Sequence, residues 1–187
     1  MIFDVFDLKT VATIVHVFGA IIGAGGAFVS DGIFFKSVED GKIDRKEIEF
    51  LIVGSKFVWI GLFILILSGL VLVFTDVSGY LSSSKFLAKM TIVGVITLNG
   101  LIFHFLHIPH IRRHEGIIFR ESPEFLKKSN LLAASGAISL ISWICAVMLG
   151  SIRTIPASYA LIISMYAFLL ILGCLGAVVF KKQVLRL

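Results

Sequence analysis

Five long apolar stretches dominate the chain and decide what it can fold into. They lie near residues 10–35, 50–75, 85–109, 129–150 and 157–180. A helix needs about 20 apolar residues to cross a hydrocarbon core of about 30 Å, and each stretch is long enough. The connections leave no room for a second domain, and 58% of the 187 residues are hydrophobic, more than a soluble domain carries. We therefore predict an all-α fold: a single transmembrane domain over residues 1–187, built as a bundle of five helices.

The lysines and arginines are divided unevenly between the two sides of this predicted bundle. Of the 17, only Lys9, Lys85, Lys89 and Arg153 belong to the side of the N-terminus. The opposite side holds the others, with Lys56 a few residues inside its span: Lys36, Lys42, Arg45, Lys46, Arg112, Arg113, Arg120, Lys127, Lys128, Lys181, Lys182 and Arg186. Basic residues collect on the cytoplasmic side, so we expect the N-terminus outside and the C-terminus in the cytoplasm of a multi-pass protein of the cell (inner) membrane. Anionic lipid headgroups are then the partners of the basic loops, and no nucleic acid is expected.

Capping motifs precede three of the stretches. Asp44 with Glu47 forms a capping-box pattern before the second stretch, and Ser122 stands before Pro123 ahead of the fourth. Serines at 82–84 precede the third stretch. These motifs predict helix starts close to the boundaries drawn from hydropathy.

The first stretch carries small residues at helical spacing, among them Gly19, Gly23 and Gly26, which we call the glycine patch. Small side chains let another helix approach closely, which favours plain helix packing. The same surface would also accommodate a flat cofactor ring. Both interpretations stay open at this point.

Ionisable side chains within the apolar stretches fall into two layers. Counting residues from each boundary places His16 and Lys89 in an outer layer, and Asp31 and Lys56 in an inner layer on antiparallel helices. Such residues are costly in a membrane and indicate functional sites by default. Because the depths match, we predict a buried ion pair between Asp31 and Lys56. The functional alternative is a proton or ion relay that continues to two polar residues of the third stretch: Asn99 and His104.

Four histidines follow one another at the end of the third stretch: His104, His107, His110 and His114. At about 100° per residue they lie within one stripe of a helix, which Pro109 is expected to kink. Neutral imidazole binds zinc, copper or iron, and spacings of three and four residues suit two ligands from one helix. The stripe is compatible with a solvated helix end, with a metal or haem site involving His104, His107 or His110, or with pH sensing.

Two short segments resemble a known family. They are Ile14-Val15-His16-Val17-Phe18-Gly19 in the first stretch and Phe86-Leu87-Ala88-Lys89-Met90-Thr91 at the start of the third. Both resemble the small bacterial membrane protoporphyrinogen oxidases of the HemJ type, and the CopD-like membrane domains of copper handling are similar in layout. Over roughly the first three helices, the resemblance implies a haem b protein. It implies His16 as an axial ligand and Lys89 as a partner of haem or substrate propionates.

Three functions follow as expectations. The first is a membrane haem b protein with a redox role, either electron transfer or a porphyrin- or oxygen-linked oxidoreductase. In that case His16 is the ligand, Lys89 its electrostatic partner, and Gly19, Gly23 and Gly26 accommodate the ring. The second is a copper or other transition-metal binding or transport protein that uses the His104–His114 stripe. The third is a non-catalytic membrane scaffold. The sequence leaves open whether the chain is an enzyme, which redox partner it has, and whether it forms a homo-oligomer.

Overall fold

The computed structural model of the chain describes residues 7–185, in which helices account for most positions and no strand occurs. Two short elements, the α-helix α3 and the 3₁₀ helix η3, lie in connections. The third long helix is interrupted by a π-helical turn, η2. In chain order the elements are α1 (Leu8–Asp40), α2 (Arg45–Thr75), α3 (Val77–Leu81), α4 (Ser84–Ile102), η2 (Phe103–His107), α5 (Ile108–Arg113), η3 (Phe119–Glu121), α6 (Pro123–Ser151) and α7 (Tyr159–Leu185).

Five helices are long and apolar enough to cross a membrane: α1, α2, α4 with its continuation through η2 and α5, α6, and α7. Their outward surface is apolar as well, since Phe74 is 78% exposed and Phe105 is 66% exposed. Such a surface is unfavourable in water and suits lipid. The five predicted helices are confirmed, and the chain is an all-helical protein of the multi-pass membrane class.

Side-chain caps fix the starts of α2 and α6. Asp44 Oδ1 accepts from the Glu47 backbone N–H at 2.9 Å, and Glu47 Oε2 accepts from the Asp44 N–H at 2.9 Å. Ser122 Oγ accepts from the Phe125 N–H at 3.2 Å, with Pro123 in the first turn. Because these caps satisfy the free N–H groups, each helix begins several residues before its apolar stretch.

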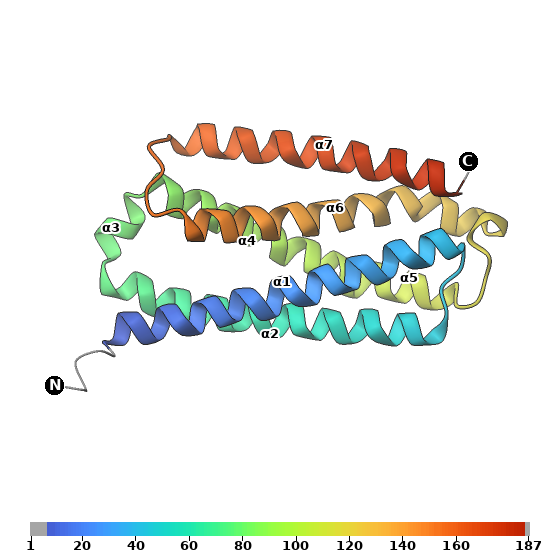
Figure 1. The fold of residues 1–187 in the computed structure, drawn as a ribbon, viewed down its shortest axis with the longest axis horizontal. Helices are drawn as coiled ribbons and strands as arrows, with labels where there is room; N and C mark the ends of the chain where they lie inside the picture. Colours follow the sequence, from blue (N-terminus) through green and yellow to red (C-terminus); the bar gives the residue numbers. More distant parts are fainter. Residues whose placement is uncertain (1–6, 186–187) are drawn as a thin grey trace.

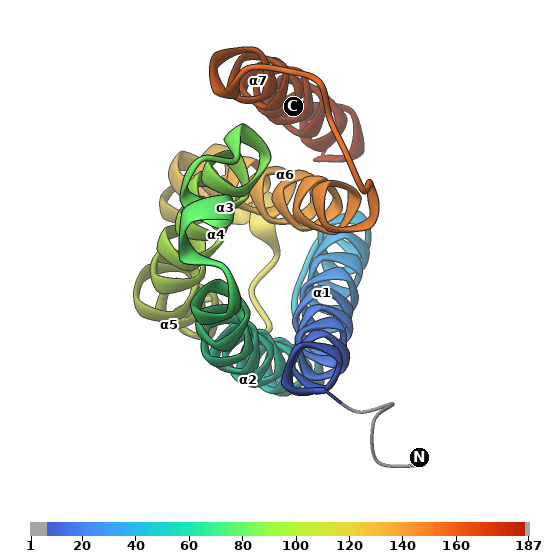
Figure 2. The same ribbon diagram turned by 90° about the vertical axis from the view of Figure 1, so that its left-hand side faces the viewer.

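The long helices run side by side along one axis, with their connections at two ends (Figure 1). Viewed along that axis, α1, α2, α4 and α6 surround a common interior, and α7 lies outside this ring against α6 (Figure 2). One end of the bundle gathers the ends of α1, α5 and α7 with the starts of α2 and α6. We call it the basic end, because the uneven distribution of lysine and arginine in the sequence places most of them there.

Glycines bring the backbones of α1 and α2 into direct contact. A Cβ atom added to Gly61 would lie 2.5 Å from Gly23 Cα and 2.7 Å from the Gly19 carbonyl oxygen. A Cβ added to Gly26 would lie 2.9 Å from the Gly54 carbonyl oxygen. Only residues without side chains allow two helices to approach this closely.

The third long helix widens at η2, where the Ile108 N–H bonds back to the Phe103 carbonyl in the π-helical pattern. Pro109 follows directly, and its nitrogen has no hydrogen to give to the carbonyl four residues earlier. The expected disturbance by Pro109 therefore takes the form of a π-helical turn. A wider turn rotates each residue by less than the usual angle of about 100°, so side chains before and after it no longer share one stripe.

A compact aromatic core closes the basic end. The Phe119 and Phe125 rings stack with centroids 4.0 Å apart, and the two residues are 0% and 1% exposed. The connection between α5 and α6 is tied to the one between α1 and α2, since Gly116 N–H donates to Ile43 O at 2.9 Å and Phe119 N–H donates to Gly41 O at 2.8 Å. These contacts hold the start of α6 beside the end of α5.

Candidate functional site

A cluster of possible metal ligands lies at the basic end, where α5 meets α6. His110 and His114 come from α5 and its C-cap, and Glu124 from the first turn of α6. One ligand atom from each side chain lies within 4.8 Å of the other two. Both histidines are 4% exposed, while Glu124 is exposed. We call these three residues the ligand cluster.

One hydrogen bond orients the His114 imidazole, and a stacking contact orients that of His110. His114 Nδ1 lies 2.8 Å from the His110 carbonyl oxygen, a distance at which Nδ1–H donates and Nε2 keeps its lone pair. Both ring nitrogens of His110 are buried and have no hydrogen-bond partner. The His110 ring stacks on Phe125 with centroids 5.8 Å apart and an interplanar angle of 10°. A metal-binding imidazole is usually held by a hydrogen bond from its second nitrogen, and His114 has this arrangement.

The histidine stripe does not stay together in the structure. His104 is exposed on the apolar side of the helix, and His107 is buried, 3% exposed, with Nε2 unpartnered. His104 and His107 both lie in η2, where each residue rotates by less than about 100°, so the regular helical wheel that grouped all four histidines does not hold there. Of the predicted ligand set, only His110 belongs to the cluster, which adds His114 and Glu124.

Two imidazoles and one carboxylate suit a divalent first-row transition metal and leave coordination positions open. None of the three ligands is a thiolate or a thioether, the groups that favour copper(I).

Sequence reasoning missed Glu124 because it comes from another helix. The only signal for it was the Ser122-Pro123 cap, which starts α6 just before this residue.

A second polar group lies toward the opposite end and links three helices. Lys89 Nζ on α4 is 3.1 Å from His16 Nε2 on α1, and His16 Nδ1 is 3.0 Å from Ser68 Oγ on α2. An ammonium has only donors, so a protonated Lys89 donates to Nε2 and leaves the hydrogen on Nδ1. Ser68 then accepts from Nδ1–H and donates to the Ile64 carbonyl at 2.6 Å. The structure thus brings His16 and Lys89 together.

We expect His16→Ala to lower the free energy of unfolding by about 2 kcal/mol, because it removes the acceptor of a partly buried Lys89. Adding Lys89→Met should restore most of the loss, since no unpaired group remains. The thermal midpoint of the detergent-purified variants measures both effects. A double variant as unstable as His16→Ala alone would contradict the pairing.

The surroundings of His16 do not fit a haem ring in this packing. Both ring nitrogens of His16 already have partners. The free face of Gly23 is filled by the Trp143 side chain, and those of Gly19 and Gly26 by α2. The glycine patch therefore serves helix packing here, and haem b stays a prediction from the resemblance.

The structure does not form the predicted ion pair between Asp31 and Lys56. Lys56 is exposed on the outward surface of α2, whereas Asp31 lines a pocket inside the bundle. Depth along the helix was matched correctly, but the two side chains point in different directions around their helices.

The relay toward the third helix is also interrupted. Asn99 is tied to α6, since its Nδ2 donates to Ser135 O at 3.0 Å and its Oδ1 accepts from Ser135 Oγ at 2.8 Å. His104 is exposed, one turn beyond. The structure therefore leaves Asp31 as the ionisable residue of the interior pocket.

Comparisons with known proteins do not assign the chain to a family. No family model matches the chain, and no curated protein or solved structure is significantly similar to it. The fold and the sites therefore define only a class of protein. It is an all-helical multi-pass membrane protein with a histidine–carboxylate cluster at one end and polar groups inside the bundle.

Proposed function

We propose that this protein belongs to the cytoplasmic membrane and binds a divalent transition-metal ion at its cytoplasmic end, with the ligand cluster as the site. The orientation is supported by the excess of lysine and arginine at the basic end, which the positive-inside rule assigns to the cytoplasm. The N-terminus is then outside and the C-terminus cytoplasmic. Anionic headgroups surround the basic end.

The observation that carries this proposal is the state of His110. Its two ring nitrogens are buried without a partner, within reach of His114 and Glu124. Buried polar atoms are nearly always hydrogen-bonded, and leaving one unpaired is costly. A metal ion bound by His110 would satisfy one of these two nitrogens.

The ligand set also indicates which ions bind and how firmly. Two imidazoles and a carboxylate suit zinc or iron(II), and the open coordination positions are those of an exchangeable site. Glu124 is exposed, so an ion reaches the cluster from water. These features support reversible binding of a metal ion from the cytoplasm.

Metal titration of the detergent-purified, metal-free protein tests the proposal. Cobalt(II) binding is followed by visible absorption, and zinc affinity by displacement of the cobalt. We expect His110→Ala to weaken zinc binding by at least about 100-fold, since it removes a direct ligand and even the loss of a group that hydrogen-bonds to a ligand costs about 10- to 100-fold.

His104→Ala is the matched control, because His104 lies on the same helix but is exposed outside the cluster. It should leave zinc affinity unchanged. Equal affinity in the wild type and in His110→Ala would rule out the ligand cluster. A loss in His104→Ala would instead favour the set of His104, His107 and His110.

The redox role with haem b stays a prediction beside this proposal. It rests on the resemblance at His16 and Lys89 alone, because the 3.1 Å contact between these two side chains occupies His16 Nε2 in this packing. A reduced-minus-oxidised spectrum of protein from haem-replete cells decides it. Haem b bands that vanish in His16→Ala would establish it. A colourless protein that also fails to bind metal would favour a scaffold.

A further inference from the structure

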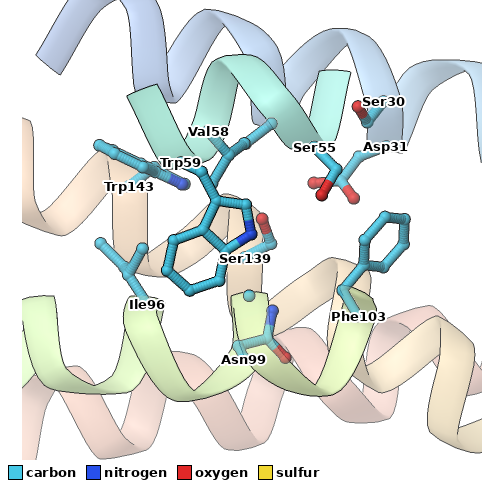
Figure 3. A pocket seen from close by; sticks show the side chains of 12 residues that line it. Ser30, Asp31, Ser55, Val58, Trp59, Ile96, Asn99, Phe103, Ser139 and Trp143 are labelled. Atoms are coloured by element: carbon cyan, nitrogen blue, oxygen red, sulfur yellow. The ribbon is translucent and has the colours of Figure 1, made fainter. Parts of the chain in front are cut away.

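A small pocket, lined mostly by apolar side chains but with several polar ones, lies in the interior of the bundle and shares no residue with the ligand cluster. It has a volume of about 40 Å³ and is bounded by side chains of α1, α2, α4, η2 and α6. Figure 3 shows Asp31, Ser30 and Ser55 gathered on one side, Asn99 on the other, and the Trp59 ring between them. The pocket has room for about three water molecules, since one buried water needs about 10–15 Å³.

Asp31 Oδ2 is fully buried at this pocket and has no hydrogen-bond partner, and the same is true of Ser30 Oγ. The other oxygen, Oδ1, lies near Gly136, and Ser139 is the neighbouring hydroxyl. Among the side chains that the structure describes, Asp31 takes part in no ion pair. A carboxylate in a lipid-surrounded bundle without a positive partner is strongly unfavourable.

The composition of the pocket indicates what would compensate the charge. Its polar groups offer oxygen atoms: the Asp31 carboxylate and the hydroxyls of Ser30, Ser55 and Ser139. Oxygen ligands prefer hard cations. With a single carboxylate, a monovalent ion neutralises the site, whereas a divalent ion would leave an excess positive charge.

We propose that the pocket around Asp31 is a binding site for a small monovalent cation of the sodium type. Asp31 supplies the charge and the three serine hydroxyls supply neutral oxygen ligands. Room remains for one ligand water. This site is independent of the metal ion proposed at the basic end, and its readout differs from that of the cobalt titration.

The chain offers a built-in reporter for this site. It contains 2 tryptophans, Trp59 and Trp143, and both line the pocket. The detergent-purified full chain, in buffer with a chelator, is titrated with sodium chloride against choline chloride at constant ionic strength. Choline is larger than the pocket. We expect a saturable change in tryptophan fluorescence with sodium alone, matched by retention of radiolabelled sodium in equilibrium dialysis.

Asp31→Asn keeps the shape and removes the charge, so it should weaken sodium binding by at least about tenfold, a loss of about 1.4 kcal/mol. The control is Asp40→Asn, on the same helix but exposed, which should leave binding unchanged. If Asp31→Asn does not fold, Ser139→Ala replaces it, with a smaller loss of affinity expected. Absence of sodium-specific binding in the wild type, or equal binding in the Asp31 or Ser139 variant, would overturn the proposal.

Discussion

Gly61→Ala is expected to lower the free energy of unfolding by about 3 kcal/mol, the upper end of the usual cost of overpacking. The added methyl group would lie 2.5 Å from Gly23 Cα and 2.7 Å from the Gly19 carbonyl oxygen. These are backbone atoms, which cannot rotate away as a side chain would. The helices α1 and α2 must separate, and the other helices then no longer pack closely against them. The thermal midpoint of the detergent-purified protein measures the loss.

Gly25→Ala is the matched control for this prediction. Gly25 lies on α1 beside the glycine patch, but no atom within 4 Å would meet its Cβ. Alanine is also the better helix former, so this variant should be as stable as the wild type or slightly more so. Equal midpoints for Gly61→Ala and Gly25→Ala would show that the close approach of α1 and α2 is not essential.

Phe125→Ala should cost about 3–5 kcal/mol, as for other buried phenylalanines, and should also weaken metal binding. Phe125 is 1% exposed and lies between Phe119 and His110, with ring centroids 4.0 and 5.8 Å away. Its loss leaves a cavity in the aromatic core and removes the surface that orients the His110 imidazole. Thermal unfolding and the cobalt titration measure the two effects on one sample.

The control for Phe125→Ala is Phe168→Ala, because Phe168 is 60% exposed on α7. That change removes the same side chain from a lipid-facing position, so it should alter neither the aromatic core nor metal affinity. Unchanged cobalt binding in a destabilised but folded Phe125→Ala protein would show that His110 does not depend on stacking for its orientation.

The positions of the helices could be predicted from the sequence because the causes are local. Hydropathy identified the five helices, and the capping motifs at Asp44 and Ser122 agree with the observed starts. Observed helices are longer than the apolar stretches at the basic end, since hydropathy does not detect polar turns that a cap stabilises. The π-helical turn at Phe103–His107 had only Pro109 as its signal.

Side-chain directions were harder to predict, because they depend on how each helix is rotated in the bundle. Residue counting gave depth, which suffices for His16 and Lys89 to meet. It failed for Lys56, which has the depth of Asp31 but faces outward. It could not identify Glu124, whose contribution depends on the fold of the connection between α5 and α6.

The length of α1 indicates that the two proposed sites lie in different surroundings: the ligand cluster in the headgroup layer and the Asp31 pocket in the hydrocarbon core. Its 33 residues make it about 50 Å long at about 1.5 Å per residue, against a hydrocarbon core of about 30 Å. The polar first turns of α2 and α6 occur at the same end, so much of this surplus projects past the acyl chains into the headgroup layer. A hydrated ion would reach the proposed ligand cluster there from the side of the exposed Glu124, without entering the hydrocarbon core. An ion bound at Asp31 must shed most of its water shell on the way in, so exchange at the inner site should be the slower of the two.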